Sequence, residues 1–126
     1  MPKVLIVDDN LEGCRPLARL LAREGHEVRC AASGPEALSL LKDQNGFQLI
    51  LLDIMMPEMD GIQVLRALRS DENPTLREIP VLMYTALSDS DTLKRATAAG
   101  AQGYLVKGSS WETLRRSIEP HLSSAA

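Results

Sequence analysis

The residues best suited to chemistry in this chain of 126 residues are three acids, one hydroxyl and one lysine, each at the end of an apolar run. They are Asp8, Asp9, Asp53, Thr85 and Lys107. A carboxylate at the end of a buried strand is costly unless a cation compensates its charge. Carboxylate oxygens are ligands that Mg²⁺ prefers, and a carboxylate beside a metal ion can attack a phosphoryl group. These residues predict metal binding and phosphoryl transfer if the fold brings them together.

The elements that must position these residues alternate between strands and helices. Apolar runs predict strands at residues 4–7, 27–31, 49–52, 81–84 and 103–106. Helical spacing and cap signatures predict a helix after each strand, with caps at Ser33, Asp60, Ser88 and Ser109 and a polar loop around residue 74. Strand–helix units of this kind imply an α/β fold, a doubly wound parallel sheet with helices on both faces. The flavodoxin-like (βα)5 order 2-1-3-4-5 is the expected arrangement.

In this strand order the carboxyl ends of the first and third strands lie side by side, where such sheets bind ligands. Asp8, Asp9 and Asp53 should meet there, with Thr85 and Lys107 on the other side. Three carboxylates this close repel one another, and Lys107 together with a hard divalent ion can compensate them. The predicted cluster contains neither cysteine nor histidine, which argues against zinc. Asp53 lies at its centre and is the predicted nucleophile.

Composition and charge limit the classes of protein to which this chain can belong. Apolar residues make up 44% and charged residues 25%, as in ordinary globular domains, so we expect one domain over residues 1–126, with its core at about 3–120 and a tail at 121–126. The net charge of −3 and the lack of a basic stripe argue against direct nucleic-acid binding. No apolar run is long enough for a signal peptide or a membrane span, so we expect a cytoplasmic protein without membrane attachment. Cys14 and Cys30 lie in apolar surroundings without metal-ligand spacing and are predicted to be buried, reduced thiols.

Four motifs, taken in order and at their spacing, resemble the receiver domain of two-component response regulators. They are VDDN at 7–10, LLDIMMPEMDG at 51–61, PVLMYTA at 80–86 and GYLVK at 103–107. The resemblance covers residue 3 to about residue 120. It implies a signalling domain that accepts a phosphoryl group from a histidine kinase or a phosphotransfer protein. Such a domain catalyses its own phosphorylation and slow dephosphorylation and is not otherwise an enzyme.

The resemblance also implies a role for each residue at the site. Asp53 would accept the phosphoryl group. Asp9, Asp53 and the backbone carbonyl of Met55 would bind Mg²⁺, or Mn²⁺ in its place, with Asp8 acting largely through water. Lys107 would pair with the phosphoryl oxygens.

The resemblance further implies a conformational switch. Thr85 would move to hydrogen-bond the phosphate, and Tyr104 would follow as the switch aromatic. The changed surface would comprise the fourth helix, fifth strand and fifth helix, roughly residues 88–119, and would contact a downstream protein or an output domain. A homodimer is compatible with this role. On residue type alone, Tyr104 could equally be a half-buried core aromatic.

Three further positions bear on the lifetime of the phosphoryl group and on the position of Lys107. Met55 lies two residues beyond Asp53, and Leu87 lies two residues beyond Thr85. By the resemblance, both border the path of attacking water, which neither side chain can orient, so we predict slow self-dephosphorylation. Gly108 follows Lys107 where receivers usually have a proline, which makes the position of this lysine a question for the structure.

Three other functions are compatible with parts of the pattern. A flavin-binding electron carrier shares the expected fold, but the acids of VDDN would repel a flavin phosphate. A metal-dependent phosphohydrolase commonly has a second acid two residues after its nucleophile, where this chain has Met55. A docking module that is never phosphorylated is also compatible with the sequence, because Gly108 stands after Lys107 where receivers usually have a proline.

Overall fold

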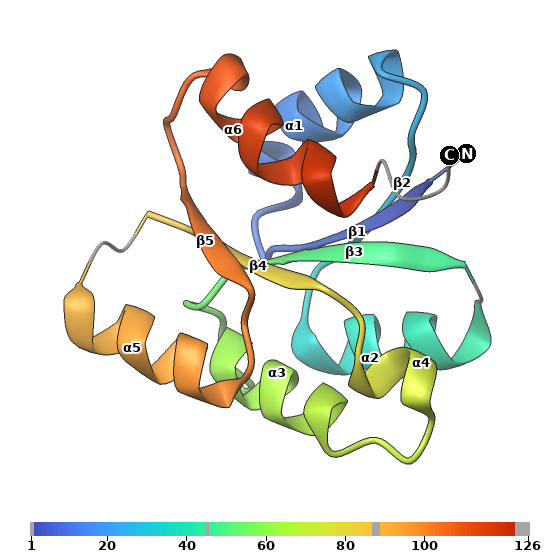
Figure 1. The fold of residues 1–126 in the computed structure, drawn as a ribbon, viewed down its shortest axis with the longest axis vertical. Helices are drawn as coiled ribbons and strands as arrows, with labels where there is room; N and C mark the ends of the chain where they lie inside the picture. The colour runs from blue at the N-terminus through green and yellow to red at the C-terminus, as the bar shows by residue number, and fades with distance from the viewer. Residues whose placement is uncertain (1, 45, 87–88, 123–126) are drawn as a thin grey trace.

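A computed structural model describes residues 2–44, 46–86 and 89–122 and shows a parallel sheet between two layers of helices (Figure 1). The strands are β1 (Lys3–Val7), β2 (Glu27–Ala31), β3 (Phe47–Leu52), β4 (Val81–Thr85) and β5 (Gly103–Val106). Every pairing is parallel and the strand order is β2-β1-β3-β4-β5. The predicted fold class and strand order are confirmed.

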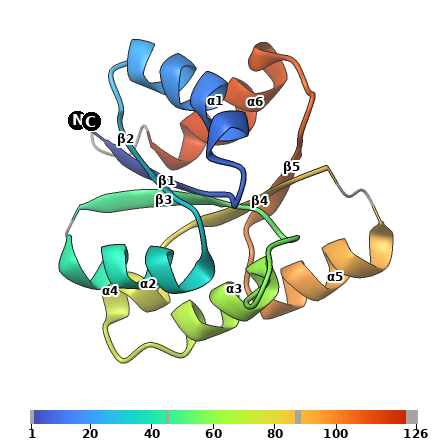
Figure 2. The ribbon, with the colours of Figure 1, turned by 180° about the vertical axis from the view of Figure 1, so that it is seen from behind.

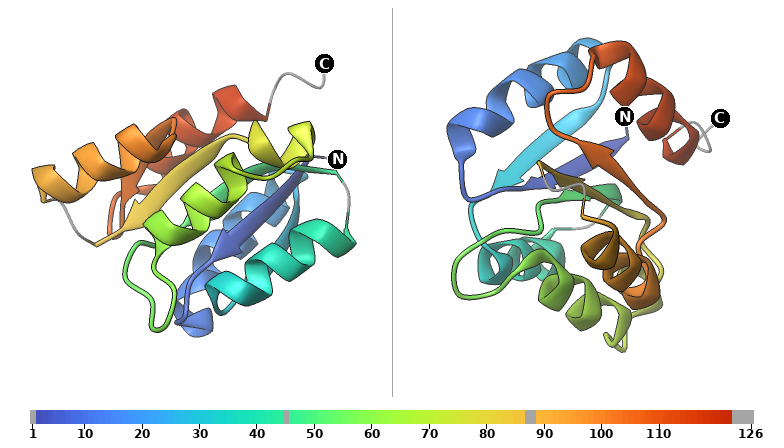
Figure 3. Two further views of the ribbon diagram at one scale, coloured as in Figure 1. Left: turned by 90° about the horizontal axis from the view of Figure 1, so that it is seen from below. Right: turned by 90° about the vertical axis from the view of Figure 1, so that its left-hand side faces the viewer.

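The helices divide between the two faces of the sheet. One face carries α1 (Leu11–Arg23) and α6 (Trp111–Ile118), and the other carries α2 (Gly34–Asp43), α3 (Gly61–Arg69) and α5 (Ser90–Ala99), as Figures 1 and 2 show. Figure 3 shows the same layers from the side and from below. The segment predicted as a polar loop contains one more short helix, α4 (Pro74–Arg77), and α6 is followed by the 3-10 turn η1 (Glu119–His121).

The core is aliphatic and lies on both sides of the sheet. In β1, Val4 and Ile6 pack toward α1 and α6, whereas Leu5 and Val7 pack toward α2 and α3. All four side chains are almost completely buried. A strand covered on both faces is a continuous apolar run, and its polar residues are confined to its ends. This is why the chemistry of the chain collects at one edge of the sheet.

Two of the four predicted helix caps are confirmed. Ser33 accepts a hydrogen bond from the backbone N–H of Glu36, and Asp60 forms a capping box with Gln63. The fourth predicted helix is α5, whose cap is Asp89; the predicted cap Ser88 lies outside the described residues.

The predicted start of the last helix is wrong by one residue. Ser110, and not Ser109, caps α6 by accepting a hydrogen bond from Thr113 N–H. Both serines have a suitable hydroxyl, so only the backbone path after β5 selects between them. Helix α6 stops at Ile118, and Pro120 lies in η1.

The predicted redox state of the two cysteines is also wrong, although Cys14 is buried and Cys30 is partly buried. Cys14 of α1 and Cys30 of β2 form a disulfide, with their Cα atoms 7.3 Å apart. The two residues are 16 positions apart on different elements. Hydrophobic periodicity places each of them inside but does not say which helix position faces which strand position.

None of the helices in the described part of the chain is long and apolar enough to cross a bilayer.

Gly61 fixes how closely α3 approaches the end of β3. A Cβ atom at this position would overlap the backbone carbonyl oxygen of Asp53. The N–H of Gly61 donates to the carbonyl of Ile54 at 2.9 Å, which closes the intervening loop. The backbone that carries Asp53 is therefore held in place by the start of α3.

We predict that Gly61→Ala lowers the free energy of unfolding by about 3 kcal/mol, because the overlap is with backbone atoms that no rotamer change can relieve. Chemical denaturation followed by circular dichroism measures it. Gly25→Ala is the matched control, since Gly25 has a φ of 92° and no atom within 4 Å of its Cβ position. It should cost about 1 kcal/mol, the conformational penalty alone. Equal losses in the two variants would contradict the steric explanation.

Candidate functional site

Three carboxylates meet at the carboxyl ends of β1 and β3, as the strand order predicts. Asp8 and Asp53 follow paired residues of these neighbouring strands, and Asp53 N–H donates to the carbonyl of Val7 at 2.9 Å. One carboxylate oxygen from each of Asp8, Asp9 and Asp53 lies within 4.8 Å of the others. Asp8 is 2% exposed and Asp53 5% exposed, whereas Asp9 is open to solvent. The cluster thus has a buried floor and an accessible side.

Lys107 reaches this cluster from β5. Its backbone N–H donates to the carbonyl of Thr85 at 2.9 Å, which continues the pairing of β4 with β5. Its Nζ donates to Asp8 Oδ2 at 2.7 Å and to Asp53 Oδ2 at 3.1 Å. Gly108 follows through a trans peptide with a φ of 93°. The exchange of the usual proline for glycine therefore leaves the lysine at its predicted position.

The N-terminal end of α1 fixes the second oxygen of Asp8. Asn10 N–H donates to Asp8 Oδ1 at 2.9 Å, and the Asn10 side chain caps α1 by accepting from Gly13 N–H at 3.1 Å. Each oxygen of Asp8 therefore has a donor, one from the backbone and one from Lys107. Asp8 is held in one orientation by its own loop.

The electrostatics follow from burial and from this shared cation. Burial raises the pKa of Asp53, Asp8 adds to the rise, and the hydrogen bond and charge of Lys107 oppose it without cancelling it. Burial lowers the pKa of Lys107, but its hydrogen bonds to Asp8 and Asp53 and the charges of these two carboxylates together raise it by more, so the net pKa is above its ordinary value. Lys107 therefore stays protonated, and Asp53 carries a charge that the fold compensates only in part.

The remaining predicted site residues lie around this centre. Thr85 ends β4 and is 1% exposed, and it pairs with Val106 of β5. Tyr104 is 52% exposed and lines an open apolar hollow with α5. The Met55 side chain is 64% exposed beside the loop that follows Asp53. Leu87 lies outside the described residues.

Tyr84 is a neighbour of the site to which the sequence analysis gave no role. Lys107 Nζ lies 5.6 Å from the centroid of the Tyr84 ring. The register of β4 and β5 pairs Tyr84 with Leu105, which places Tyr84 and Lys107 on the same face. This contact depends on the register of the two strands and cannot be read from the motif PVLMYTA alone.

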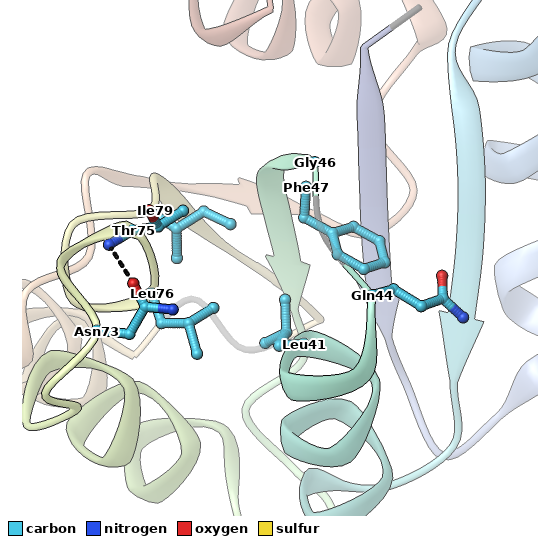
Figure 4. Close-up of a pocket in the computed structure, with 8 residues that line it drawn as sticks. All are labelled: Leu41, Gln44, Gly46, Phe47, Asn73, Thr75, Leu76 and Ile79. Carbon is cyan, nitrogen blue, oxygen red and sulfur yellow. Dashed lines mark hydrogen bonds between the residues drawn. The ribbon is translucent and has the colours of Figure 1, made fainter.

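A cavity of about 180 Å³ lies at the opposite edge of the sheet, near the amino ends of β3 and β4 (Figure 4). Its lining residues are Leu41, Gln44, Gly46, Phe47, Asn73, Thr75, Leu76 and Ile79. None of these described residues is ionisable or nucleophilic apart from the hydroxyl of Thr75. The ionisable groups therefore gather at the acidic cluster and not at this cavity.

Comparison with known proteins supports the same assignment. The family model of the response regulator receiver domain matches residues 4–119. This chain belongs to that family. As a receiver domain it is similar to transcriptional regulatory protein ZraR of Escherichia coli K12, with 38% identity over 120 residues that cover 95% of this chain and 26% of ZraR. It is also similar to histidine kinase 3 of Arabidopsis thaliana, with 35% identity in an alignment 140 residues long. The alignment covers 97% of this chain and 14% of the kinase. The chain thus spans about a quarter of the length of the first relative and less of the second.

Solved structures resemble this receiver domain over nearly their whole length. The chemotaxis protein CheY4 of Vibrio cholerae matches with a TM-score of 0.87 and 33% identity, covering 97% of this chain and 99% of CheY4. The response regulator TrrA of Thermotoga maritima, solved in complex with Mg²⁺-BeF, matches with a TM-score of 0.84 and 29% identity, covering 97% and 100%. The fold assignment rests on these matches as well as on the strand order.

The donor atoms of the receiver domain fit a hard divalent cation. The cluster offers carboxylate oxygens from three residues, and Mg²⁺ prefers oxygen ligands. Asp8, Asp9, Asp53 and Lys107 together carry three negative charges and one positive charge. The charge that remains is the charge that a divalent ion would neutralise.

We predict that Asp53→Asn raises the free energy of unfolding at pH 7.5 by about 1 kcal/mol, the scale of a single substitution. A raised folded-state pKa means that the charged form of Asp53 is disfavoured by folding. The stability that protonated Asp53 contributes to the fold is fully present below the ordinary carboxylate pKa of 3.8. It is lost as the pH rises through the folded-state pKa of Asp53. The difference between variant and wild type should therefore shrink as pH falls toward 3.8.

Urea denaturation of the metal-free protein over a series of pH values measures this effect. Glu72→Gln removes an exposed carboxylate outside the cluster and is the control. An Asp53→Asn protein that is less stable than wild type at pH 7.5 would show that the pairing with Lys107 outweighs burial.

Proposed function

We propose that this chain is a two-component phosphorelay receiver that accepts a phosphoryl group on Asp53 from a histidine kinase or a phosphotransfer protein, in a Mg²⁺-dependent reaction. The observation that carries the proposal is the contact of one lysine ammonium with two buried carboxylates beside a third, accessible acid. A phosphoryl group entering from the side of Asp9 meets a nucleophile, a cation and a hydroxyl-bearing strand end. Phosphoryl transfer requires little more than such positioning and charge neutralisation.

The reaction follows from the positions of these side chains. A carboxylate oxygen of Asp53 attacks the phosphorus in line with the bond to the donor nitrogen, which leaves with the electrons of the broken bond. Lys107 releases Asp53 and pairs with the phosphoryl oxygens in its place. When bound through Asp9, Asp53 and the Met55 carbonyl, Mg²⁺, or Mn²⁺ in its place, would neutralise charge on the phosphoryl oxygens. Asp8 would act largely through water, and the two hydrogen bonds that already engage its oxygens support this assignment.

The switch begins with the change of charge at Asp53. Phosphorylation adds about −1.5 to −2 charges and three acceptor oxygens, so the phosphoryl group offers Lys107 and Thr85 an additional partner that exists only in the phosphorylated state. Thr85 would move toward the phosphate and Tyr104 would follow from its exposed position. The predicted fourth helix, fifth strand and fifth helix correspond to α5, β5 and α6. The hollow that Tyr104 shares with Leu93 and Thr97 of α5 supports a readout at this face.

The position of Lys107 and the nature of the relatives bear on the wider role. The contact of Lys107 with Asp53, despite Gly108, supports a phosphorylated receiver over a docking module without phosphorylation. One relative is named a transcriptional regulatory protein and another a histidine kinase, so similar sequences occur in both kinds of protein. We propose one receiver domain over residues 1–126 that signals to an output domain or a separate protein. Homodimerisation is compatible with this role, direct nucleic-acid binding is not part of it, and the cytoplasmic location stays a prediction.

We predict that incubation with acetyl phosphate and Mg²⁺ adds one phosphoryl group to the wild-type protein, measured by intact mass spectrometry. Asp53→Asn should abolish the adduct, and removal of Mg²⁺ with a chelator should abolish it in wild type. Asp60→Asn is the matched control, because asparagine also caps helices and Asp60 lies outside the cluster. An adduct that survives in Asp53→Asn would refute the proposal.

We predict slow self-dephosphorylation, because Met55, two residues beyond Asp53, would border the path of attacking water and cannot orient it. Met55→Asn, alone or with Leu87→Glu, should shorten the half-life of the phosphorylated protein by about tenfold, a modest effect for a positioned polar group. Decay of the adduct after removal of acetyl phosphate measures it by mass spectrometry. Met55→Leu keeps an apolar side chain and should leave the half-life unchanged. An unchanged or longer half-life in Met55→Asn would contradict the assignment.

A further inference from the structure

The side chain of Tyr84 lies beneath the lysine of the site. Tyr84 pairs with Leu105 in the register of β4 and β5, and Thr85 pairs with Val106. Side chains two residues apart on a strand share a face, so Lys107 is the diagonal neighbour of Tyr84. The measured 5.6 Å from Lys107 Nζ to the ring centroid lies within the range of a cation–π contact.

The ring is a fixed support. Tyr84 is 8% exposed and belongs to the core cluster that includes Leu105 and Leu114. Burial raises the pKa of its phenol, so the ring faces Lys107 as a neutral group. Movement of this side chain would require the packing between the sheet and α6 to open.

The backbone after Lys107 gives no comparable support. Gly108 is exposed, and no atom lies within 4 Å of its Cβ position. The lysine backbone is anchored by the hydrogen bond to Thr85, but its ammonium contacts Asp8 and Asp53, two groups that take part in metal binding or phosphoryl transfer under the proposed function. The ring of Tyr84 is the neighbour of this ammonium that the reaction leaves unchanged.

We propose that Tyr84 is a positioning residue, whose ring face holds the Lys107 ammonium beside Asp53 while the other partners of the lysine change. The effect on rate rests on the proposed function, whereas the contact itself exists in the unphosphorylated protein. The aromatic ring and not the hydroxyl carries the effect, so phenylalanine at this position should hold the lysine as well as tyrosine does.

The chain contains a matched pair at the opposite edge of the sheet. Lys3 Nζ lies 4.4 Å from the centroid of the Phe47 ring, and Phe47 is 7% exposed. Phe47→Leu therefore removes a buried aromatic ring under a lysine, as Tyr84→Leu does, but far from Asp53. Comparing Phe47→Leu with Tyr84→Leu therefore separates the effect of lost core packing from the effect of lost lysine positioning.

The first test uses carbon–proton NMR spectra of the lysine side chains in the unphosphorylated protein. Protons above a ring face are shielded, so the Lys107 ε-methylene signal should lie upfield of those of the exposed Lys42 and Lys94. Lys107→Arg assigns it by its loss. Tyr84→Phe should keep the shift and Tyr84→Leu should remove it without changing the Lys3 signal. A wild-type Lys107 signal at the position of the exposed lysines would overturn the inference, whatever the stability of the variants.

The second test measures the rate of Asp53 phosphorylation against acetyl phosphate concentration at saturating Mg²⁺. Tyr84→Leu should lower the maximal rate about three- to fivefold, in keeping with the strength of a partly exposed cation–π contact. Tyr84→Phe and Phe47→Leu should stay near the wild-type rate. An equal loss in Phe47→Leu, or a loss in Tyr84→Phe as large as in Tyr84→Leu, would overturn the positioning role. If wild type gains no phosphoryl group, the proposed function fails and the NMR test alone decides on the contact.

Discussion

One lysine ammonium shared by two buried carboxylates is the interaction on which the site depends. Asp8 and Asp53 end neighbouring strands, so the sheet itself forces their charges together, and each carboxylate in such a setting needs a partner. Lys107 supplies it from β5, across the end of β4, with contacts of 2.7 and 3.1 Å. This strand order places the three strand ends so that one long side chain meets both acids. The topology thus assembles the site as well as packing the core.

The same interaction explains why the cluster could hold a divalent cation. Lys107 compensates one of the three carboxylates, and Asp9 stays accessible on the open side of the cluster. Under the proposed function, a phosphoryl group would bring further negative charge to Asp53, and a metal ion would help to neutralise that charge during transfer. Lys107 would exchange part of its contact with Asp53 for the phosphoryl oxygens. A residue such as Tyr84, whose ring would stay fixed while these partners change, would then keep the lysine in position.

Much of the fold and of the site could be predicted because burial and topology dictate them. Strands covered on both faces give continuous apolar runs, and the end of each run marks where a polar residue reaches the sheet edge. What the pattern could not supply were contacts that depend on the relative rotation of elements. The Cys14–Cys30 disulfide, the choice of Ser110 over Ser109 and the ring of Tyr84 under Lys107 all belong to this class. Periodicity gives the face of a residue, whereas the packed structure gives its neighbour.

The fold tolerates this cluster of charges because the backbone beneath it is fixed from several directions. Asp53 is hydrogen-bonded to β1 through its own N–H, and its carbonyl lies against Gly61, where no side chain fits. Asp8 is held through the loop that begins α1. A carboxylate whose burial raises its pKa is a cost to stability, but relaxation of the loop would require the sheet end and two helix starts to move together. The rigidity that makes the charge costly therefore also keeps Asp53 in the position from which it can react.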